Sequence, residues 1–146
     1  MQGFISDYTK LSVGLAYATG TADREGAVLD MKGWDGVLII CQLAVIATGG
    51  TNSVKAQQGA LSNGTDMADL AGTKQVIADD DDGEVVFIDV YQPRERYVRA
   101  YFDKDTSNAC GETITYLQYK GALNPTAAMG SGVNGEQHAS PAEGTA

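Results

Sequence analysis

The stretch that decides the fold is GEVVFIDVYQPRERYVRAYFDK, from Gly83 to Lys104. It holds two segments rich in β-branched and aromatic residues, Glu84–Tyr91 and Arg96–Asp103, a composition typical of strands. The four residues between them include Pro93, which suits the second position of a tight turn. The pattern therefore predicts a β-hairpin.

Both faces of the first predicted strand carry apolar side chains. Strict alternation places Val86, Ile88 and Val90 on one face. The opposite face receives Val85, Phe87 and Tyr91 together with Asp89. A sheet face that contacts water is normally polar, so we expect something other than water to cover each face.

Further strand-like segments lie on either side of this stretch. Val37–Ile46, VLIICQLAVI, is the most apolar, and its β-branched residues and flanking glycines favour a strand over a helix. Its two faces are both apolar, so this strand is central in its sheet or meets another subunit. The other predicted strands are Lys10–Ala18, Gly26–Met31, Asn52–Leu61, Lys74–Ala78 and Glu112–Lys120. About eight short strands separated by turns predict an all-β fold, an antiparallel, jelly-roll-like β-sandwich.

The 146 residues are enough for a single domain. We expect the sandwich to occupy residues 1–120. After Gly121 the alternation stops and Gly, Ala, Ser and Pro dominate, a composition that cannot form a core alone. Residues 121–146 are therefore predicted to form an extended C-terminal arm. Trp34, between Gly33 and Gly36, is interpreted as a packing anchor at the mouth of the core.

The charge and the N-terminal sequence limit the partners. The formal net charge of −9 disfavours direct binding to nucleic acid, which requires a basic face. No apolar run approaches the length that crosses a membrane. The N-terminus does not resemble an export signal, so we expect synthesis in the cytoplasm and no membrane association.

The residue types that catalysis and metal binding require are few. The chain has two cysteines, Cys41 and Cys110, and one histidine, His138, which lies in the predicted arm. This set cannot complete an ordinary zinc site, and it offers no nucleophile beside a positioned base. The run Asp79–Asp82 lacks the spacing of a calcium loop and favours a solvated loop, with cation binding left open. We therefore expect no enzyme activity, cofactor or metal.

The basic residues cluster with aromatic ones around the second predicted strand. Such a surface can bind sugars or single-stranded nucleic acid, or it can simply face solvent. In an acidic chain the arginines also have carboxylates on an identical neighbour as partners, and we favour this interpretation. The candidate subunit interface consists of Tyr91, Arg94, Arg96, Tyr97, Arg99 and Tyr101.

Three segments resemble small virion proteins of tailed bacteriophages. They are VKAQQGALSNGTDMADLAGT, VVFIDVYQPRERYVRAYFDKDT and the final HASPAEGTA. The sequence is most similar to head-decoration (cement) proteins and related minor capsid proteins. The resemblance covers Asp30 to Lys120 and the last residues, whereas residues 1–24 have no counterpart.

The resemblance implies a virion structural protein located on the capsid surface. Such a subunit forms homo-oligomers, most often trimers, and binds the outer face of the phage head. There it stabilises contacts between major capsid proteins, its principal partner. Two alternatives remain open: a carbohydrate- or ligand-binding β-sandwich module, suggested by Trp34 and the aromatic and basic residues, or another virion position, at the head–tail joint, the tail or the fibre base.

Overall fold

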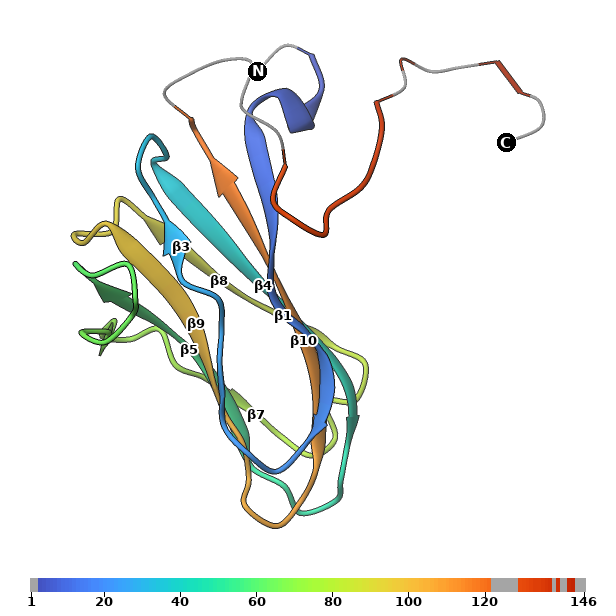
Figure 1. Ribbon diagram of the computed structural model, residues 1–146. Helices are drawn as coiled ribbons and strands as arrows, with labels where there is room; N and C mark the ends of the chain where they lie inside the picture. The colour runs from blue at the N-terminus through green and yellow to red at the C-terminus, as the bar shows by residue number, and fades with distance from the viewer. Residues whose placement is uncertain (1–2, 122–128, 138, 140–141, 144–146) are drawn as a thin grey trace.

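A computed structural model shows two antiparallel sheets packed face to face (Figure 1). It describes residues 3–121, 129–137, 139 and 142–143. The first sheet has the order β1 (Thr9–Gly20), β10 (Cys110–Tyr119), β4 (Gly36–Ile46) and β8 (Val85–Tyr91). The second sheet has the order β2 (Arg24–Glu25), β9 (Tyr97–Asp103), β5 (Asn52–Gly59) and β6 (Ala68–Asp69), while β3 (Leu29–Asp30) also pairs with β9 and β7 (Gln75–Ile77) with β5.

The strand order confirms the predicted all-β, jelly-roll-like sandwich. Every pairing is antiparallel. Along the chain, β1, β4, β8 and β10 belong to the first sheet, and the strands between them belong to the second. The chain thus alternates between the sheets, as it does in a jelly roll. The short helix η1 (Ile5–Asp7) precedes β1.

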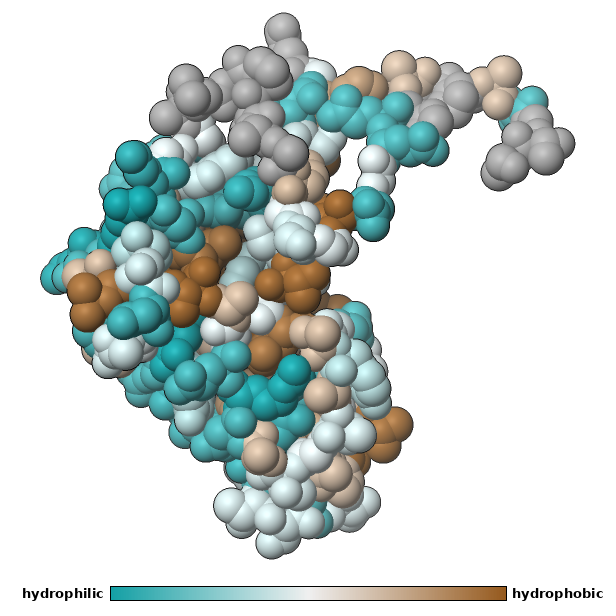
Figure 2. All heavy atoms as spheres, viewed as in Figure 1, coloured by the Kyte–Doolittle hydropathy of each residue, from teal (hydrophilic) through white to brown (hydrophobic). Residues whose placement is uncertain are grey.

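The core lies between the sheets and is filled by side chains of alternating strand residues. Val37, Ile39 and Cys41 of β4 face Val98, Ala100 and Phe102 of β9, and all six are at most 1% exposed. In the space-filling view, hydrophobic residues gather towards the middle of the molecule and hydrophilic residues surround them (Figure 2). Burial of this apolar surface supplies the main driving force for folding.

The predicted hairpin between Glu84–Tyr91 and Arg96–Asp103 is wrong, although both strands exist. β8 pairs with β4 in the first sheet, and β9 pairs with β5 in the second. The connection between them crosses from one sheet to the other. Gln92 has a positive φ of 49° and donates its N–H to the Asp35 carbonyl, beside β4. The N–H of Arg94 then binds the side chain of Gln58 in β5, so the turn leads the chain away from β8.

The other predicted strands are present, with small differences at their ends. Val37–Ile46 forms β4, which lies between β10 and β8, as a central strand should. The predicted strand Gly26–Met31 is shifted: β2 ends at Glu25, and only Leu29–Asp30 of that segment forms a strand, β3. Gly26 still donates its N–H to Ala100 of β9. This close approach requires glycine, because a Cβ there would lie 2.4 Å from the Tyr116 hydroxyl.

The helix η1 and the described part of the predicted arm lie at the same end of the sandwich (Figure 1). Trp34 is half-buried and packs against the core, in agreement with its interpretation as an anchor. Part of the predicted arm, including His138, lies outside the described residues. In the described part, the N–H of Gly130 donates to the Leu11 carbonyl at 2.7 Å. The side chain of Gln137 binds Ser6 and Asp7 near η1.

Candidate functional site: the two outer faces of the sandwich

The outer face of the first sheet is apolar. Residues that alternate with the core residues of all four strands point outward, and most of them are hydrophobic. Phe87 is 63% exposed and Val85 56% exposed, far more than large apolar side chains usually are. We call this surface the apolar face; it consists of Leu11, Val13, Leu38, Ile40, Val85, Phe87, Tyr91, Leu117 and Tyr119.

The register of the strands places these side chains in rows across the sheet, which also include Thr115 of β10 and Asp89 of β8. Leu11 lies opposite Leu117, which in turn lies opposite Leu38. In a second row, Ile40 of the central strand lies opposite Phe87 of β8. Directly opposed side chains on one face are close enough to contact one another. The apolar face is therefore one patch rather than a set of separate hydrophobic residues.

A groove of about 540 Å³ lies at the end of the apolar face nearest η1. Its polar features come from few residues: the Tyr119 hydroxyl donates a 2.6 Å hydrogen bond to Asp89, and Lys120 lies 4.8 Å from the ring centre of Tyr91. Burial and the hydrogen bond to Asp89 raise the pKa of Tyr119. The groove is lined by Ile5, Tyr8, Thr9, Leu38, Asp89, Leu117, Tyr119 and Lys120.

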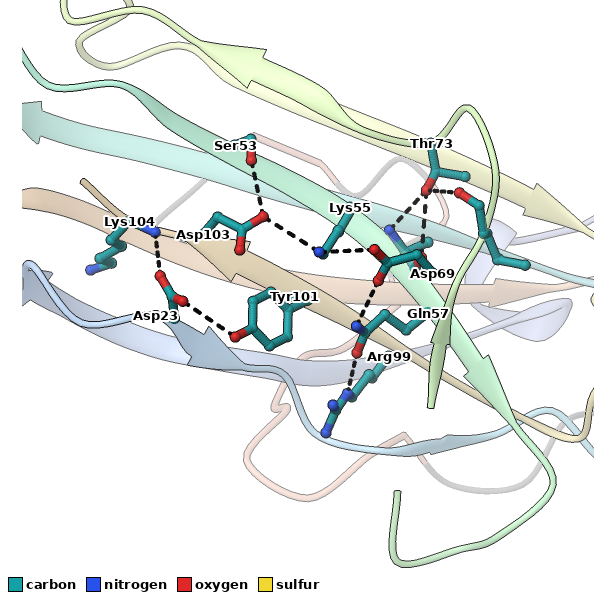
Figure 3. A network of polar contacts seen from close by, with 12 residues as sticks. Asp23, Ser53, Lys55, Gln57, Asp69, Thr73, Arg99, Tyr101, Asp103 and Lys104 are labelled. Atoms are coloured by element: carbon teal, nitrogen blue, oxygen red, sulfur yellow. Dashed lines mark hydrogen bonds and ion pairs between the residues drawn. The ribbon is translucent and has the colours of Figure 1, made fainter. Parts of the chain in front are cut away.

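The outer face of the second sheet carries a network of polar contacts instead (Figure 3). Lys55 binds Asp69 at 3.0 Å and lies 3.6 Å from Asp103. Gln57 donates to Asp69 and accepts a 2.7 Å hydrogen bond from Arg99. These contacts connect β5, β6 and β9. The charged groups on this face are thus largely paired within the chain.

The structure does not bring the six predicted interface residues onto one surface. Tyr91 lies on the apolar face of the first sheet, and Arg94 is exposed in the crossing between the sheets. Tyr97, Arg99 and Tyr101 share the outer face of the second sheet, because alternate residues of a strand point to the same face. The side chain of Arg96 reaches Asp30.

Two of the predicted arginines already have carboxylate partners in their own chain. Arg96 makes a bidentate contact with Asp30 at 2.9 and 2.8 Å, and its hydrogen bond lowers the pKa of that carboxyl. Arg99 is 9% exposed and pairs with Glu25 at 3.0 Å. A neighbouring subunit would have to compete with these internal pairs. The interface role of the six residues stays a prediction.

A charged cluster is buried between the ends of the two sheets. Glu112 of β10 forms ion pairs with Arg24 of β2 and with Lys104, which follows β9. Both Glu112 and Lys104 are buried. The two cysteines, Cys41 and Cys110, are also buried and are not joined by a disulfide. Burial, followed by the negative charge of Glu112, raises the pKa of Cys41 to about 12.

The acidic run Asp79–Asp82 binds backbone groups of its own chain. Asp82 accepts the N–H of Ile46 at 2.7 Å, Asp79 that of Gly49, and Asp81 that of Ala78. These carboxylates thus satisfy donors that the strand ends leave unpaired. Within residues 3–121, 129–137, 139 and 142–143, no group of three or more His, Cys, Asp or Glu side chains is placed to hold a metal ion. No helix in the described part of the chain is long and apolar enough to cross a membrane.

Sequence reasoning identified the outward apolar residues of β8 but not the face to which they belong. Outward-facing apolar residues could be recognised in three segments. Val37–Ile46 and Glu84–Tyr91 each carry apolar residues on both faces, and Leu117 falls on the Thr-rich face of the last strand. The sequence did not reveal the order of these strands in the sheet. Only the pairing of β8 with β4 and of β4 with β10 unites these residues.

Comparisons with known proteins leave the family open. The chain matches no protein-family model, and no curated protein sequence is significantly similar to it. One similar solved structure comes from work described as "Bacillus endospore appendages form a novel family of disulfide-linked pili". The two chains are 14% identical with a TM-score of 0.44, and the match covers 82% of this chain and 96% of that one. At this distance the likeness carries no conclusion about function.

Proposed function

We propose that this protein is a non-catalytic structural subunit that decorates the capsid of a tailed bacteriophage. The apolar face of the first sheet carries the proposal. Folded proteins seldom leave a contiguous apolar patch of several hundred Å² in water, and such patches mark surfaces that bind other proteins. The resemblance to head-decoration proteins supplies the class of partner, the major capsid protein.

Binding through this face would act by burial. A specific interface covers about 800 Å² on each partner, and the rows of outward side chains run from β1 across β10 and β4 to β8, with Thr115 and Asp89 as their polar members. Many identical copies would bind one symmetric shell. Neighbouring copies would hold the same capsid subunits, so their individual binding contributions would reinforce one another. The subunit would thereby stabilise contacts between neighbouring capsid proteins.

Co-sedimentation with capsids assembled from the major capsid protein of the same genome tests the proposal. Val13→Glu places a charge in the apolar face at a residue that is 42% exposed, so the fold should tolerate it. We expect this variant to lose capsid binding. Val76→Glu is the matched control, because Val76 is 68% exposed on β7 of the other sheet. Absence of binding by the unmodified chain, or equal loss in the two variants, would refute the proposal.

A second candidate function is the binding of a small ligand, and the groove beside η1 favours it. Leu38, Leu117 and Ile5 line the groove, whereas polar groups come mainly from Asp89 and Lys120. This lining suits an apolar or aromatic molecule better than a sugar. A thermal-shift screen with small aromatic compounds, repeated on Leu117→Glu, tests the idea. Stabilisation that persists in this variant would contradict binding in the groove.

A further inference from the structure

Three of the four sheet edges are protected against pairing with another chain. In the second sheet the outermost strands β2, β3, β6 and β7 have only two or three residues. In the first sheet, β1 has register shifts after Val13 and after Leu15. The arm also covers part of this edge, because Gly130 donates its N–H to the Leu11 carbonyl of β1. Short strands, bulges and covering segments are the usual means of blocking edge pairing.

The fourth edge, β8, has none of these protections. It is seven residues long and pairs with β4 without a register shift, from Gly36 opposite Tyr91 to Gln42 opposite Val85. Its sequence, VVFIDVY, contains neither proline nor lysine. Among the described residues, β4 is the only backbone partner of Val85–Tyr91. A long, regular, apolar edge of this kind is suited to adding another strand.

The hydrogen bonds at the two ends of β8 show which of its backbone groups are available. Gln92 donates its N–H to Asp35, and Glu84 accepts the N–H of Leu43. Even-numbered residues therefore direct their backbone groups towards β4, because the direction alternates along an antiparallel pair. The N–H and C=O groups of Val85, Phe87, Asp89 and Tyr91 point to the free edge.

We propose that two copies of this chain pair through β8, antiparallel, around a two-fold axis at Ile88. This register joins all seven residues of each strand. Val85 then lies opposite the partner's Tyr91, and Phe87 lies opposite the partner's Asp89. Each of these residues has free backbone groups, so the pairs can exchange hydrogen bonds as well as side-chain contacts.

The strand itself favours a second copy as the occupant and this register over its neighbours. An axis at Asp89 would place two carboxylates directly opposite each other, which is unfavourable. An axis at Phe87 would leave Tyr91 beyond the end of the partner strand. The chain as a whole carries a net charge of −9 and would repel its copies, but Asp89 is the single charged residue of β8. This edge is therefore a place where identical chains can approach.

The pairing would merge two four-stranded sheets into one of eight strands. The apolar face of each chain would continue into that of its partner, which doubles the surface available to a third protein. The proposal replaces the trimer implied by the resemblance with a two-fold dimer. It does not depend on the capsid role, because the pairing requires only two copies of this chain and can be tested on purified protein.

Analytical ultracentrifugation and light scattering of the full chain test the proposal through a pair of charge variants. The unmodified chain should have the mass of two copies. Phe87→Asp places a second carboxylate opposite the partner's Asp89, twice per dimer, and should raise the dimer dissociation constant by about tenfold or more. Phe87→Lys removes the same ring but faces Asp89 with an opposite charge, so it should remain dimeric.

Val76→Asp controls for the added charge at an exposed residue of another edge, and circular dichroism checks that each variant is folded. A monomeric or trimeric unmodified chain would overturn the proposal. So would a Phe87→Asp variant that dimerises as tightly as the unmodified chain. Equal loss of the dimer in Phe87→Asp and Phe87→Lys would overturn the register around Ile88.

Discussion

Lys104 and Glu112 form an ion pair in the interior: Nζ lies 2.5 Å from Oε2, and the two side chains are 1% and 0% exposed. Lys104 also donates a 2.7 Å hydrogen bond to the Cys110 carbonyl. Because Lys104 follows β9 and Glu112 belongs to β10, the pair connects the two sheets.

Glu112→Gln should strongly destabilise the fold. The substitution keeps the size of the side chain but leaves Lys104 as a buried charge without its carboxylate, which typically costs about 3–5 kcal/mol. Urea unfolding followed by circular dichroism measures the change in the free energy of unfolding. Asp30→Asn is the control, because it breaks the solvent-exposed pair with Arg96 and should have a much smaller effect. Similar midpoints for both variants would contradict a structural role of the buried pair.

Tyr116→Phe should also lower stability, through two hydrogen bonds that cross the sandwich. The Tyr116 hydroxyl of β10 accepts the N–H of Ala100 in β9 and donates to the Ala27 carbonyl, each at 3.0 Å. Without the hydroxyl, both buried backbone groups lose a partner, at a cost of about 1–3 kcal/mol. Tyr17→Phe, at a residue 64% exposed, should leave the unfolding midpoint unchanged. An unaltered midpoint in Tyr116→Phe would show that the hydroxyl contributes nothing.

Stability should fall in alkaline solution. Burial raises the pKa of Tyr116 from 10.0 to about 12, so the unfolded chain loses this proton first. The contribution of Tyr116 is complete below pH 10 and is lost as the pH rises towards 12. Thermal unfolding across this range checks the prediction. Tyr116→Phe, which lacks the titrating group, should show a flatter dependence on pH, and an equally steep one would exclude Tyr116 as the cause.

The two thiols should be unreactive in the folded protein. Burial raises the pKa of Cys41 to about 12 and raises that of Cys110 as well. A raised pKa keeps the thiol protonated, and the thiolate is the form that reacts, so at about pH 8 neither cysteine should react with a chromogenic disulfide reagent. Both should react at once in guanidinium chloride. Rapid labelling of the folded chain would show that the site opens to solvent.

Deletion of residues 121–146 should leave the sandwich folded. Among the described residues, the last one in the hydrophobic core is Tyr116, and the described part of the arm binds peripheral groups such as Leu11 and Ser6. We expect a near-native unfolding midpoint and weaker binding to capsids. Unfolding of the shortened chain would refute this division between domain and arm. Undiminished capsid binding would restrict the interface to the sandwich.

The strands could be predicted from the sequence because alternation and β-branched residues are local properties. Val37–Ile46 and the last strand were located almost to their ends. Partner choice is not local. The hairpin prediction failed because the turn after Tyr91 resembles a hairpin turn in composition, while the positive φ of Gln92 and its bond to Asp35 lead the chain to the other sheet.

Prediction of the candidate site also required the strand order, which the sequence does not reveal. Exposed apolar residues of β8 were visible in the alternation, but their union with Leu38 and Leu117 required the strand order. Conversely, the arginines were conspicuous in the sequence. Their carboxylate partners, Asp30 for Arg96 and Glu25 for Arg99, lie more than sixty residues away along the chain. The arginines therefore suggested an interface in the sequence, although carboxylates of the same chain neutralise Arg96 and Arg99 in the fold.

The pairing of β1 with β10 has a consequence for synthesis on the ribosome. The first strand to be made is hydrogen-bonded to the last, and β10 also separates β1 from β4. The first sheet therefore cannot close until Tyr119 has emerged. Until then the nascent chain contains β4 and β8 but lacks β10, the strand that joins them to β1. Its apolar segments therefore stay exposed for most of translation, and chaperones and self-association compete to bind them.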